Sequence, residues 1–229
     1  MIKPVYDMDG ITLYQGDSRE VLPQVASRVA VIATDPPYGI NHPTDYHTRG
    51  RGKLAKCSNY PPVLGDNEKF DPRWILNLDK PTCLWGANYF ADALPPTSGW
   101  LIWDKERPDE LDQATVEMAW TNFVKGARRF RFMWNGMLRA SDEALLHPTQ
   151  KPVALSKWVL TLRWTPQGTV ADPYAGSGST LLAAKQLGRQ AIGVELSEKY
   201  CSIIIKRLSQ TTIFQEMERS RYDNQRIVV

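Results

Sequence analysis

Short apolar runs alternate with segments of helical periodicity along most of the chain. A continuous apolar run bounded by polar residues or glycine is typical of a strand that is covered on both faces of a sheet. Six such runs predict strands over residues 10–14, 29–33, 81–85, 100–103, 168–171 and 191–194.

Helical periodicity is clearest where Leu155, Trp158, Val159 and Leu162 recur at i, i+3, i+4 and i+7. Further helices are predicted after Asp17, near Asn88, over 179–187 and after Ser197. Asp17 is placed to cap the first of them, with Glu20 completing a capping box, and Gly188 closes the helix over 179–187.

Strands that alternate with helices in this way predict an α/β fold with a doubly wound, mostly parallel sheet. Residues 114–120 and 128–133 are predicted to add a late antiparallel strand pair. Ligands of such sheets bind beyond the carboxyl ends of the strands. The loops after Ala33, Ala171 and Val194 are therefore the first places to look for a site.

Composition limits the class of protein. The 229 residues, 42% hydrophobic and 23% charged, suit one soluble α/β domain. No apolar run reaches the roughly 18 residues that a membrane span needs, and no secretion signal is visible. Three scattered cysteines fit reduced thiols in a cytoplasm. The net charge of +3 does not by itself indicate a nucleic-acid partner.

Local charge adds more than the total does. Residues 46–65 and 125–139 are basic, contain no acid and are interleaved with aromatic residues. Such segments favour contact with phosphates, although a solvated surface remains the alternative. The candidate DNA-binding residues are Arg49, Arg51, Lys53, Arg128 and Arg131.

The loop after the 29–33 strand carries Asp35, Pro36, Pro37 and Tyr38. The two prolines make a stiff turn without N–H donors, which leaves the Pro36 carbonyl available to a ligand. A carboxylate, a carbonyl and an aromatic plane together suit a planar ring that bears an amino group. They would stabilise the positive charge that develops when such an amine attacks a methyl sulfonium. The alternative is a turn in which Asp35 caps a helix and Tyr38 only packs.

The loop at 170–180 is rich in glycine and joins a strand to a helix. Gly176 and Gly178 permit close approach of a ligand to backbone N–H groups. The loop lacks both the GxGxxG of dinucleotide folds and the Gly-Lys-Ser/Thr of phosphate-binding loops, so it suits a zwitterionic methionine tail better. Glu195 lies about 20 residues beyond Asp172, where an acid can accept hydrogen bonds from a ribose. Taken alone, Glu195 would be a surface acid or a cap.

Together these segments resemble the prokaryotic and phage DNA amino-methyltransferases that modify adenine N6 or cytosine N4, over nearly the whole chain. Asp35 to Tyr38 resembles the catalytic tetrapeptide, and Asp172 to Thr180 the methionine-binding loop. His147 to Pro152 is similar to the segment that encloses the cofactor, and Gly16-Asp17-Ser18 to the element beside its adenine. The catalytic segment comes first, which is the β order of this family.

The resemblance implies a Rossmann-like methyltransferase fold, S-adenosylmethionine as cofactor and double-stranded DNA as substrate. It implies one domain over 1–229, with a catalytic half at about 10–135, a cofactor half at about 147–209 and small DNA-contacting insertions at about 41–70 and 104–146. The implied cofactor-binding residues are Asp17, Thr149, Lys151, Asp172, Tyr174, Gly176, Ser177, Gly178, Ser179, Thr180 and Glu195.

The resemblance also favours adenine, because relatives that modify cytosine usually carry Ser-Pro-Pro-Tyr. The flipped base would stack on Tyr38. A cytoplasmic enzyme and a homodimer are further expectations. Amine methylation needs no metal, and His42, His47 and Cys57 fit no zinc pattern.

Two departures from the family pattern stand out. In the family the cofactor loop commonly reads Asp-Pro-Phe, with a larger residue before the first glycine, whereas this chain has Pro173-Tyr174-Ala175 after Asp172. The second departure is the small size of the region available for target recognition. The alternatives are an RNA or protein-glutamine methyltransferase, whose Asn-Pro-Pro-Tyr follows the cofactor loop, and a non-catalytic DNA-binding module. An oxidoreductase is disfavoured by the glycine spacing.

Overall fold

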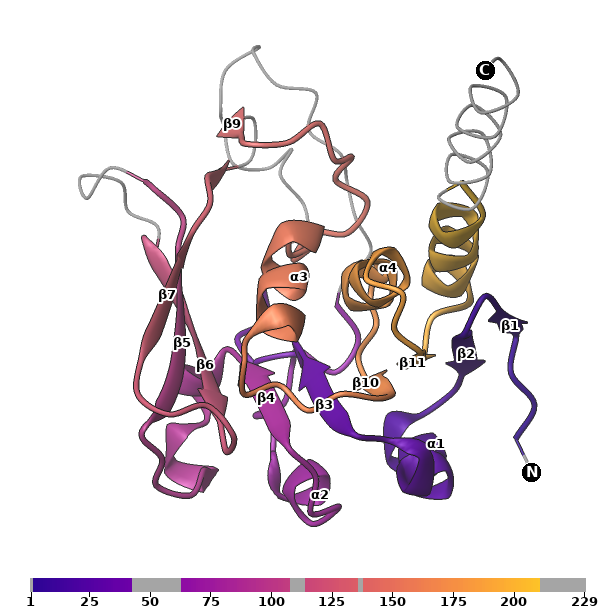
Figure 1. The fold of residues 1–229 in the computed structure, drawn as a ribbon, viewed down its shortest axis with the longest axis horizontal. Helices are drawn as coiled ribbons and strands as arrows, with labels where there is room; N and C mark the ends of the chain where they lie inside the picture. Colours follow the sequence, from indigo (N-terminus) through magenta and orange to yellow (C-terminus); the bar gives the residue numbers. More distant parts are fainter. Residues whose placement is uncertain (1, 43–62, 108–113, 136–137, 211–229) are drawn as a thin grey trace, which may run out of the picture.

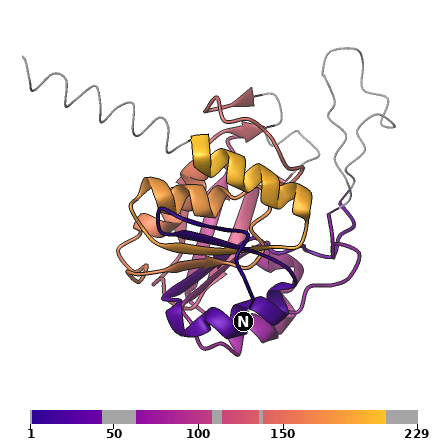
Figure 2. The same ribbon diagram turned by 90° about the vertical axis from the view of Figure 1, so that its right-hand side faces the viewer.

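The computed structural model describes residues 2–42, 63–107, 114–135 and 138–210. A nine-stranded sheet forms its centre, with helices on both faces (Figures 1 and 2). In spatial order the strands are β1 (Tyr6–Met8), β2 (Ile11–Gln15), β11 (Ala191–Glu195), β10 (Val170–Asp172), β3 (Val31–Thr34), β4 (Thr82–Trp85), β6 (Val116–Thr121), β5 (Gly99–Asp104) and β7 (Arg128–Arg131).

The sheet confirms the predicted fold class. β2, β11, β10, β3 and β4 are consecutive parallel neighbours. The late strands exist and antiparallel pairing occurs among them, but they do not pair with each other as predicted. β6 is antiparallel to both β4 and β5, whereas β7 is parallel to β5 at the outer edge. A small separate hairpin is formed by β8 (Trp134–Asn135) and β9 (Leu138–Arg139).

Helices cover the two faces unequally. α1 (Ser18–Val25) and the short α2 (Arg73–Leu76) lie on one face. The other face carries α3 (Val153–Thr161), α4 (Ser179–Gln186) and a helix over 198–210 (Figure 2). The central strands read as continuous apolar runs because both of their faces are buried in this arrangement.

Strand β3 shows how one run serves two cores. Val31 and Ala33 pack into the core beneath α3 and α4, while Ile32 packs into the core over α1 and α2. Val31 and Ile32 are completely buried. This alternation follows from the period of two along a strand. It leaves the chain directly after Thr34 at the carboxyl edge of the sheet.

The local signals at helix ends behave largely as predicted. The Asp17 carboxylate caps α1 by accepting from the Arg19 N–H at 2.8 Å, and the Ser197 hydroxyl accepts from the Tyr200 N–H at 3.5 Å. Gly188 follows α4 with a φ of 66°. Within the described residues, no helix combines the length and apolar character that crossing a bilayer demands.

The helix predicted near Asn88 is wrong. Two 3₁₀ turns occupy this stretch instead, η3 (Ala87–Tyr89) and η4 (Ala91–Ala93). Leu94 is already extended, with φ −98° and ψ 140°, because the residue before a proline is excluded from the helical region. The few residues left before Pro95 are too short a segment for an α-helix to form and persist.

Candidate active site

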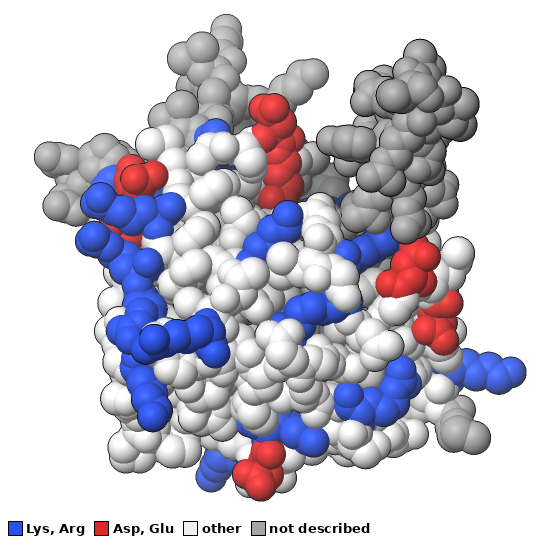
Figure 3. All heavy atoms as spheres, viewed as in Figure 1, with Lys and Arg blue, Asp and Glu red and all other residues white. Residues whose placement is uncertain are grey.

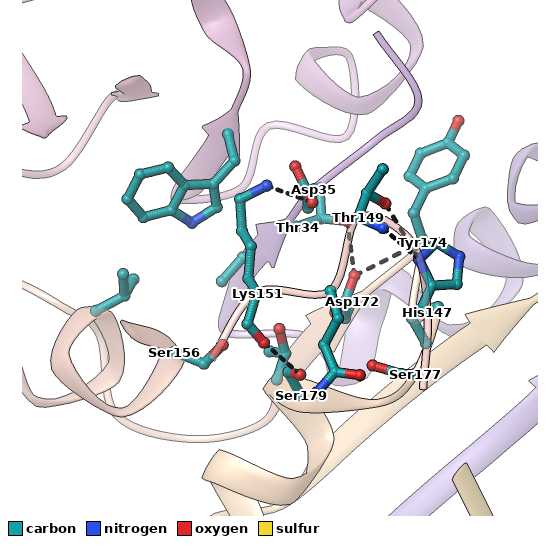
Figure 4. A pocket seen from close by; sticks show the side chains of 17 residues that line it. Thr34, Asp35, His147, Thr149, Lys151, Ser156, Asp172, Tyr174, Ser177 and Ser179 are labelled. Atoms are coloured by element: carbon teal, nitrogen blue, oxygen red, sulfur yellow. Dashed lines mark hydrogen bonds and ion pairs between the residues drawn. The ribbon is translucent and has the colours of Figure 1, made fainter. Parts of the chain in front are cut away.

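The carboxyl ends of β3, β4 and β10 open into a cavity of about 590 Å³, counting the solvent at its mouth. Figure 4 shows side chains from the first and the second half of the chain facing one another across it. Of the predicted site residues, the cavity is lined by Asp35, Thr149, Lys151, Asp172, Tyr174, Gly176, Ser177, Ser179 and Thr180.

Asp35 lies at one end of the cavity, directly after β3. Its Oδ1 accepts a hydrogen bond from the Tyr38 hydroxyl at 2.5 Å, and its Oδ2 pairs with the ammonium group of Lys151. Burial raises the pKa of the Asp35 carboxyl, and the Lys151 charge opposes that rise. The carboxylate therefore accepts hydrogen bonds from N–H and O–H donors inside a largely closed site.

The Tyr38 ring packs directly against the backbone of Gly86. The ring also stacks on Tyr89 with the ring centroids 4.9 Å apart and the planes 16° from parallel. A Cβ on Gly86 would lie 1.9 Å from the Tyr38 ring, and Gly86 has a φ of 70°. Only glycine meets both conditions. A flipped base that stacks on Tyr38 has to use ring surface that Tyr89 does not cover.

The glycine-rich loop lies at the other end of the cavity. Gly176 and Gly178 have φ values of 54° and 82°, and Gly178 precedes the first residue of α4. A Cβ placed on Gly176 would meet the His147 ring at 3.9 Å, which is ordinary van der Waals contact, so glycine is favoured here by its positive φ and not by crowding. The first N–H groups of α4 have no partner within the helix. This end of the cavity fits a ligand with a carboxylate.

Glu195 supports that loop from the end of β11. Its two carboxylate oxygens accept from the backbone N–H groups of Gly176 and Ser197, both at 2.8 Å. Burial raises the pKa of the Glu195 carboxyl. Because each carboxylate oxygen has two lone pairs, Glu195 retains acceptors for ribose hydroxyls. The geometry is compatible with the ribose role and adds a structural one.

Asp172 anchors the loop to the neighbouring strand. Its Oδ1 accepts from the Thr34 hydroxyl at 2.6 Å and from the Tyr174 N–H at 3.2 Å. Burial raises the pKa of the Asp172 carboxyl to about 6. Thr34 immediately precedes Asp35, so Asp172 couples the position of the catalytic candidate to that of the loop.

The start of α1 also reaches the loop. The Ser18 hydroxyl donates to the carbonyl of Pro173, and the Gly16 N–H donates to the carbonyl of Glu195 at 3.1 Å. Asp17 therefore lies beside the expected cofactor region, although its own carboxylate caps α1.

His147 behaves as a loop residue. Its Nδ1 accepts from the Thr149 N–H at 3.2 Å. Burial, together with the nearby Lys151 charge, lowers the pKa of His147 to about 4. The imidazole is consequently neutral near pH 7.

Three residues of the site escaped the sequence reasoning: Trp85, Lys105 and Glu117. Trp85 ends β4 and lines the cavity. Glu117 pairs with Lys151 at 3.0 Å and with Lys105. An acid inside the otherwise apolar strand 116–121 was the available signal for Glu117, but its partners could not be identified from the sequence.

The predicted DNA contacts are only partly described, since Arg49, Arg51 and Lys53 lie outside the described residues. Arg131 stands at the carboxyl end of β7, exposed and paired with Asp104 at 3.0 Å. Arg128 stands at the other end of the strand and stacks on Trp164, 4.6 Å from the ring centroid. Figure 3 shows Lys and Arg side chains gathered along this edge of the sheet.

Comparison with known sequences finds similar DNA methyltransferases. A family model described as DNA methylase, of the N6/N4 type, matches residues 95–206. The type II methyltransferase M2.LlaDCHI of Lactococcus lactis subsp. cremoris is 25% identical over 92% of this chain and 93% of its own length. The type II methyltransferase M.ScaI of Streptomyces caespitosus is 25% identical over 90% of this chain and 84% of its own length.

Comparison with solved structures supports the fold. The crystal structure of an M1.HpyAVI-SAM complex has a TM-score of 0.51 and 22% identity, covering 86% of this chain and 99% of that one. The PvuII DNA methyltransferase, titled cytosine-N4-specific, has a TM-score of 0.61 and 15% identity, covering 90% of this chain and 89% of that one. The shared feature is the mostly parallel methyltransferase sheet.

Proposed function

We propose that this chain is a DNA amino-methyltransferase of the N6/N4 family, whose model it matches over residues 95–206, and that it transfers a methyl group to the N6 amine of adenine. The observation that carries the proposal is Asp35 at the head of the tetrapeptide, half-buried directly after β3 and already bound to N–H and O–H donors. The relatives that modify cytosine usually have serine at this position.

S-adenosylmethionine supplies an electrophilic methyl group on a sulfonium. The cavity fits such a molecule, since one end offers glycine backbone and the N-terminus of α4 while Asp35 lies at the other. Gly176 and Gly178 would receive the methionine end. Glu195 would accept hydrogen bonds from the ribose, with Asp17 close to the adenine end.

Asp35 and Pro36 act on the target amine. The lone pair of a nucleobase amine is drawn into the ring, which makes the nitrogen a weak nucleophile. The Asp35 carboxylate and the Pro36 carbonyl would accept its two N–H bonds and so stabilise the positive charge that grows on the nitrogen during transfer. Because the base leaves the duplex stack to reach this site, Tyr38 would provide an aromatic surface for it.

Mass spectrometry of nucleosides tests the identity of the base. After expression of the chain in bacteria that lack DNA methylation, digested DNA is expected to contain adenine nucleosides methylated at N6. Cytosine nucleosides methylated at N4, without any methylated adenine, would contradict the base assignment while leaving amine methylation intact. The Asp35→Ala variant, expressed to the same level, provides the matched control because it is expected to leave the DNA unmodified.

The basic edge of the sheet is proposed to contact DNA phosphates. Arg131 is the better placed of the two described arginines, since the carboxyl end of β7 lies at the same edge of the sheet as the cavity. Replacement of both Arg128 and Arg131 by alanine should weaken DNA binding. It should also flatten the dependence of log K on log salt by about 0.9 for each phosphate that the protein no longer neutralises.

Fluorescence anisotropy over a salt series measures that slope. Arg28→Ala is the matched control, because Arg28 is exposed on the far side of the molecule, in the short turn after α1. An unchanged slope in the double variant would assign Arg128 and Arg131 to structural roles on Trp164 and Asp104.

A further inference from the structure

The ammonium group of Lys151 stands where three acceptors meet. It pairs with Asp35 Oδ2, lies 3.0 Å from Glu117 Oε2 and donates to the Tyr38 hydroxyl at 2.8 Å. Glu117 Oε2 accepts no hydrogen bond among the described residues, so its contact with the ammonium is an ion pair. Only 9% of the Lys151 side-chain surface is exposed. Figure 4 shows the side chain pointing to Asp35 and away from the glycine-rich loop.

This arrangement occupies the acceptor that the target amine needs. Oδ2 of Asp35 is taken by Lys151, and Oδ1 is taken by the Tyr38 hydroxyl. The ammonium offers the same kind of donor as an exocyclic amine. Each Asp35 oxygen keeps a second lone pair, so an amine can approach Asp35, but it takes over the bond that Lys151 now makes only by displacing the ammonium. A lysine charge left beside Asp35 would also repel the positive charge that grows on the amine nitrogen.

Glu117 provides a second place for the displaced charge. It lies near the start of β6, which runs opposite to β4, and so it reaches the same edge of the sheet as Asp35. Its Oε1 pairs with Lys105 and its Oε2 with Lys151. Burial alone would raise the pKa of Glu117, but the two ammonium groups lower it to about 2. Glu117 is thus a permanent anion beside Lys151.

Without Glu117, a Lys151 ammonium displaced from Asp35 would be buried with no charged partner among the described contacts. Burying an ammonium group without a counter-charge is strongly unfavourable. Without Glu117, Lys151 would have only Asp35 as a charged partner among the described contacts and would compete with the amine for it. With Glu117, the ammonium can release Asp35 and remain paired.

We propose that Lys151 fills the amine site of the free enzyme and that Glu117 is a positioning residue, which holds the Lys151 ammonium when the target amine takes its place on Asp35. The proposal rests on amine methylation as the function, but not on which base is modified. No covalent bond is made or broken in the exchange. Asp35, Tyr38, Lys151 and Glu117 all keep their protonation states.

Kinetics of the single and double variants separate this role from a structural one. Glu117→Gln should lower kcat for DNA methylation by about tenfold or more, with the KM for S-adenosylmethionine unchanged. The Glu117→Gln/Lys151→Met double variant should be faster than Glu117→Gln alone when assayed at pH 8.5, because the competing ammonium is gone. Asp92→Asn, which removes an exposed carboxylate paired with Lys69, is the control and should match the unsubstituted enzyme.

The same variants should shift the pKa of Asp35 in opposite directions. Lys151 lowers that pKa and Glu117 raises it. Lys151→Met should therefore raise the pKa of Asp35, and Glu117→Gln should lower it. Carbon-13 NMR of labelled aspartate carboxyls, with Asp35→Asn to assign the signal, measures these shifts in the free protein without any turnover. This measurement also separates the proposal from the proposed function. If the pKa of Asp35 shifts in opposite directions in the two variants but the protein methylates no DNA, the charge network is supported and the proposed function is contradicted.

Two results would overturn the proposal. One is a double variant no faster than Glu117→Gln in an otherwise active enzyme. The other is a large rise in the KM for S-adenosylmethionine in Lys151→Met with no shift in the pKa of Asp35, which would make Lys151 a cofactor ligand. If Glu117→Gln fails to fold, Lys151→Met still decides between these outcomes through the pKa and the KM.

Discussion

Replacing Asp35 by alanine should lower kcat for DNA methylation by about 10²–10³-fold, the effect of removing one preorganised partner of a developing charge. The loss is expected in kcat because Asp35 would face the amine and lies at the opposite end of the cavity from the glycine-rich loop (Figure 4). Affinity for S-adenosylmethionine, measured by calorimetry, should stay within a few-fold of the unsubstituted value.

The matched control is Asp71→Ala, which removes an exposed carboxylate that pairs only with Arg73 among the described ion pairs. It should leave both turnover and cofactor affinity unchanged. Turnover close to the original level in Asp35→Ala would mean that the amine is activated by another group.

Replacing Glu195 by alanine should weaken binding of S-adenosylmethionine by about tenfold or more, since hydrogen bonds to a charged group contribute about 1.5–3 kcal/mol. Two effects act together. The ribose would lose its acceptor, and the backbone N–H groups of Gly176 and Ser197 lose theirs. Calorimetric titration with S-adenosylmethionine, with and without DNA, measures the change.

Glu198→Ala is a suitable control, because Glu198 is exposed and directly follows Ser197, at the start of the helix over 198–210. Glu195→Gln distinguishes the two effects. A glutamine keeps one carbonyl oxygen for a backbone N–H and so should retain more of the loop than alanine does. Unchanged affinity in Glu195→Ala would show that the ribose is held elsewhere.

The sequence was most informative where one local rule determines the structure. The buried central strands read as continuous apolar runs, and the prolines after Asp35 and the glycines after Asp172 mark where two of them end. Because the carboxyl ends of parallel strands meet at one edge, the tetrapeptide and the glycine-rich loop could be placed in one site from the sequence alone.

What the sequence could not provide depends on pairing between distant segments. The insertion of β5 between β6 and β7 is a choice of neighbours that no local pattern encodes. The same choice brings Glu117 and Lys105 to the site, from strands that are antiparallel to each other. Lys151 was assigned to the cofactor by its neighbours in sequence, whereas its side chain reaches Asp35, in the first half of the chain.

The order of the motifs acquires a physical meaning in the sheet. Asp35 directly follows β3, β10 ends at the start of the glycine-rich loop, and the two strands are direct parallel neighbours. The hydrogen bond from Thr34 to Asp172 joins the two motifs across this boundary. An amine held by Asp35 and a methyl donor held by the loop would therefore meet over adjacent strand ends.

The most direct test of the central claim is transfer of a labelled methyl group by the purified protein. Unmethylated DNA is incubated with S-adenosylmethionine that carries a trideuterated methyl group, and the digested nucleosides are weighed by mass spectrometry. The account predicts the label on the exocyclic amine of adenine, at a rate that Asp35→Ala reduces by about 10²–10³-fold. Label on a ring carbon, or on no base in DNA that the protein demonstrably binds, would contradict it.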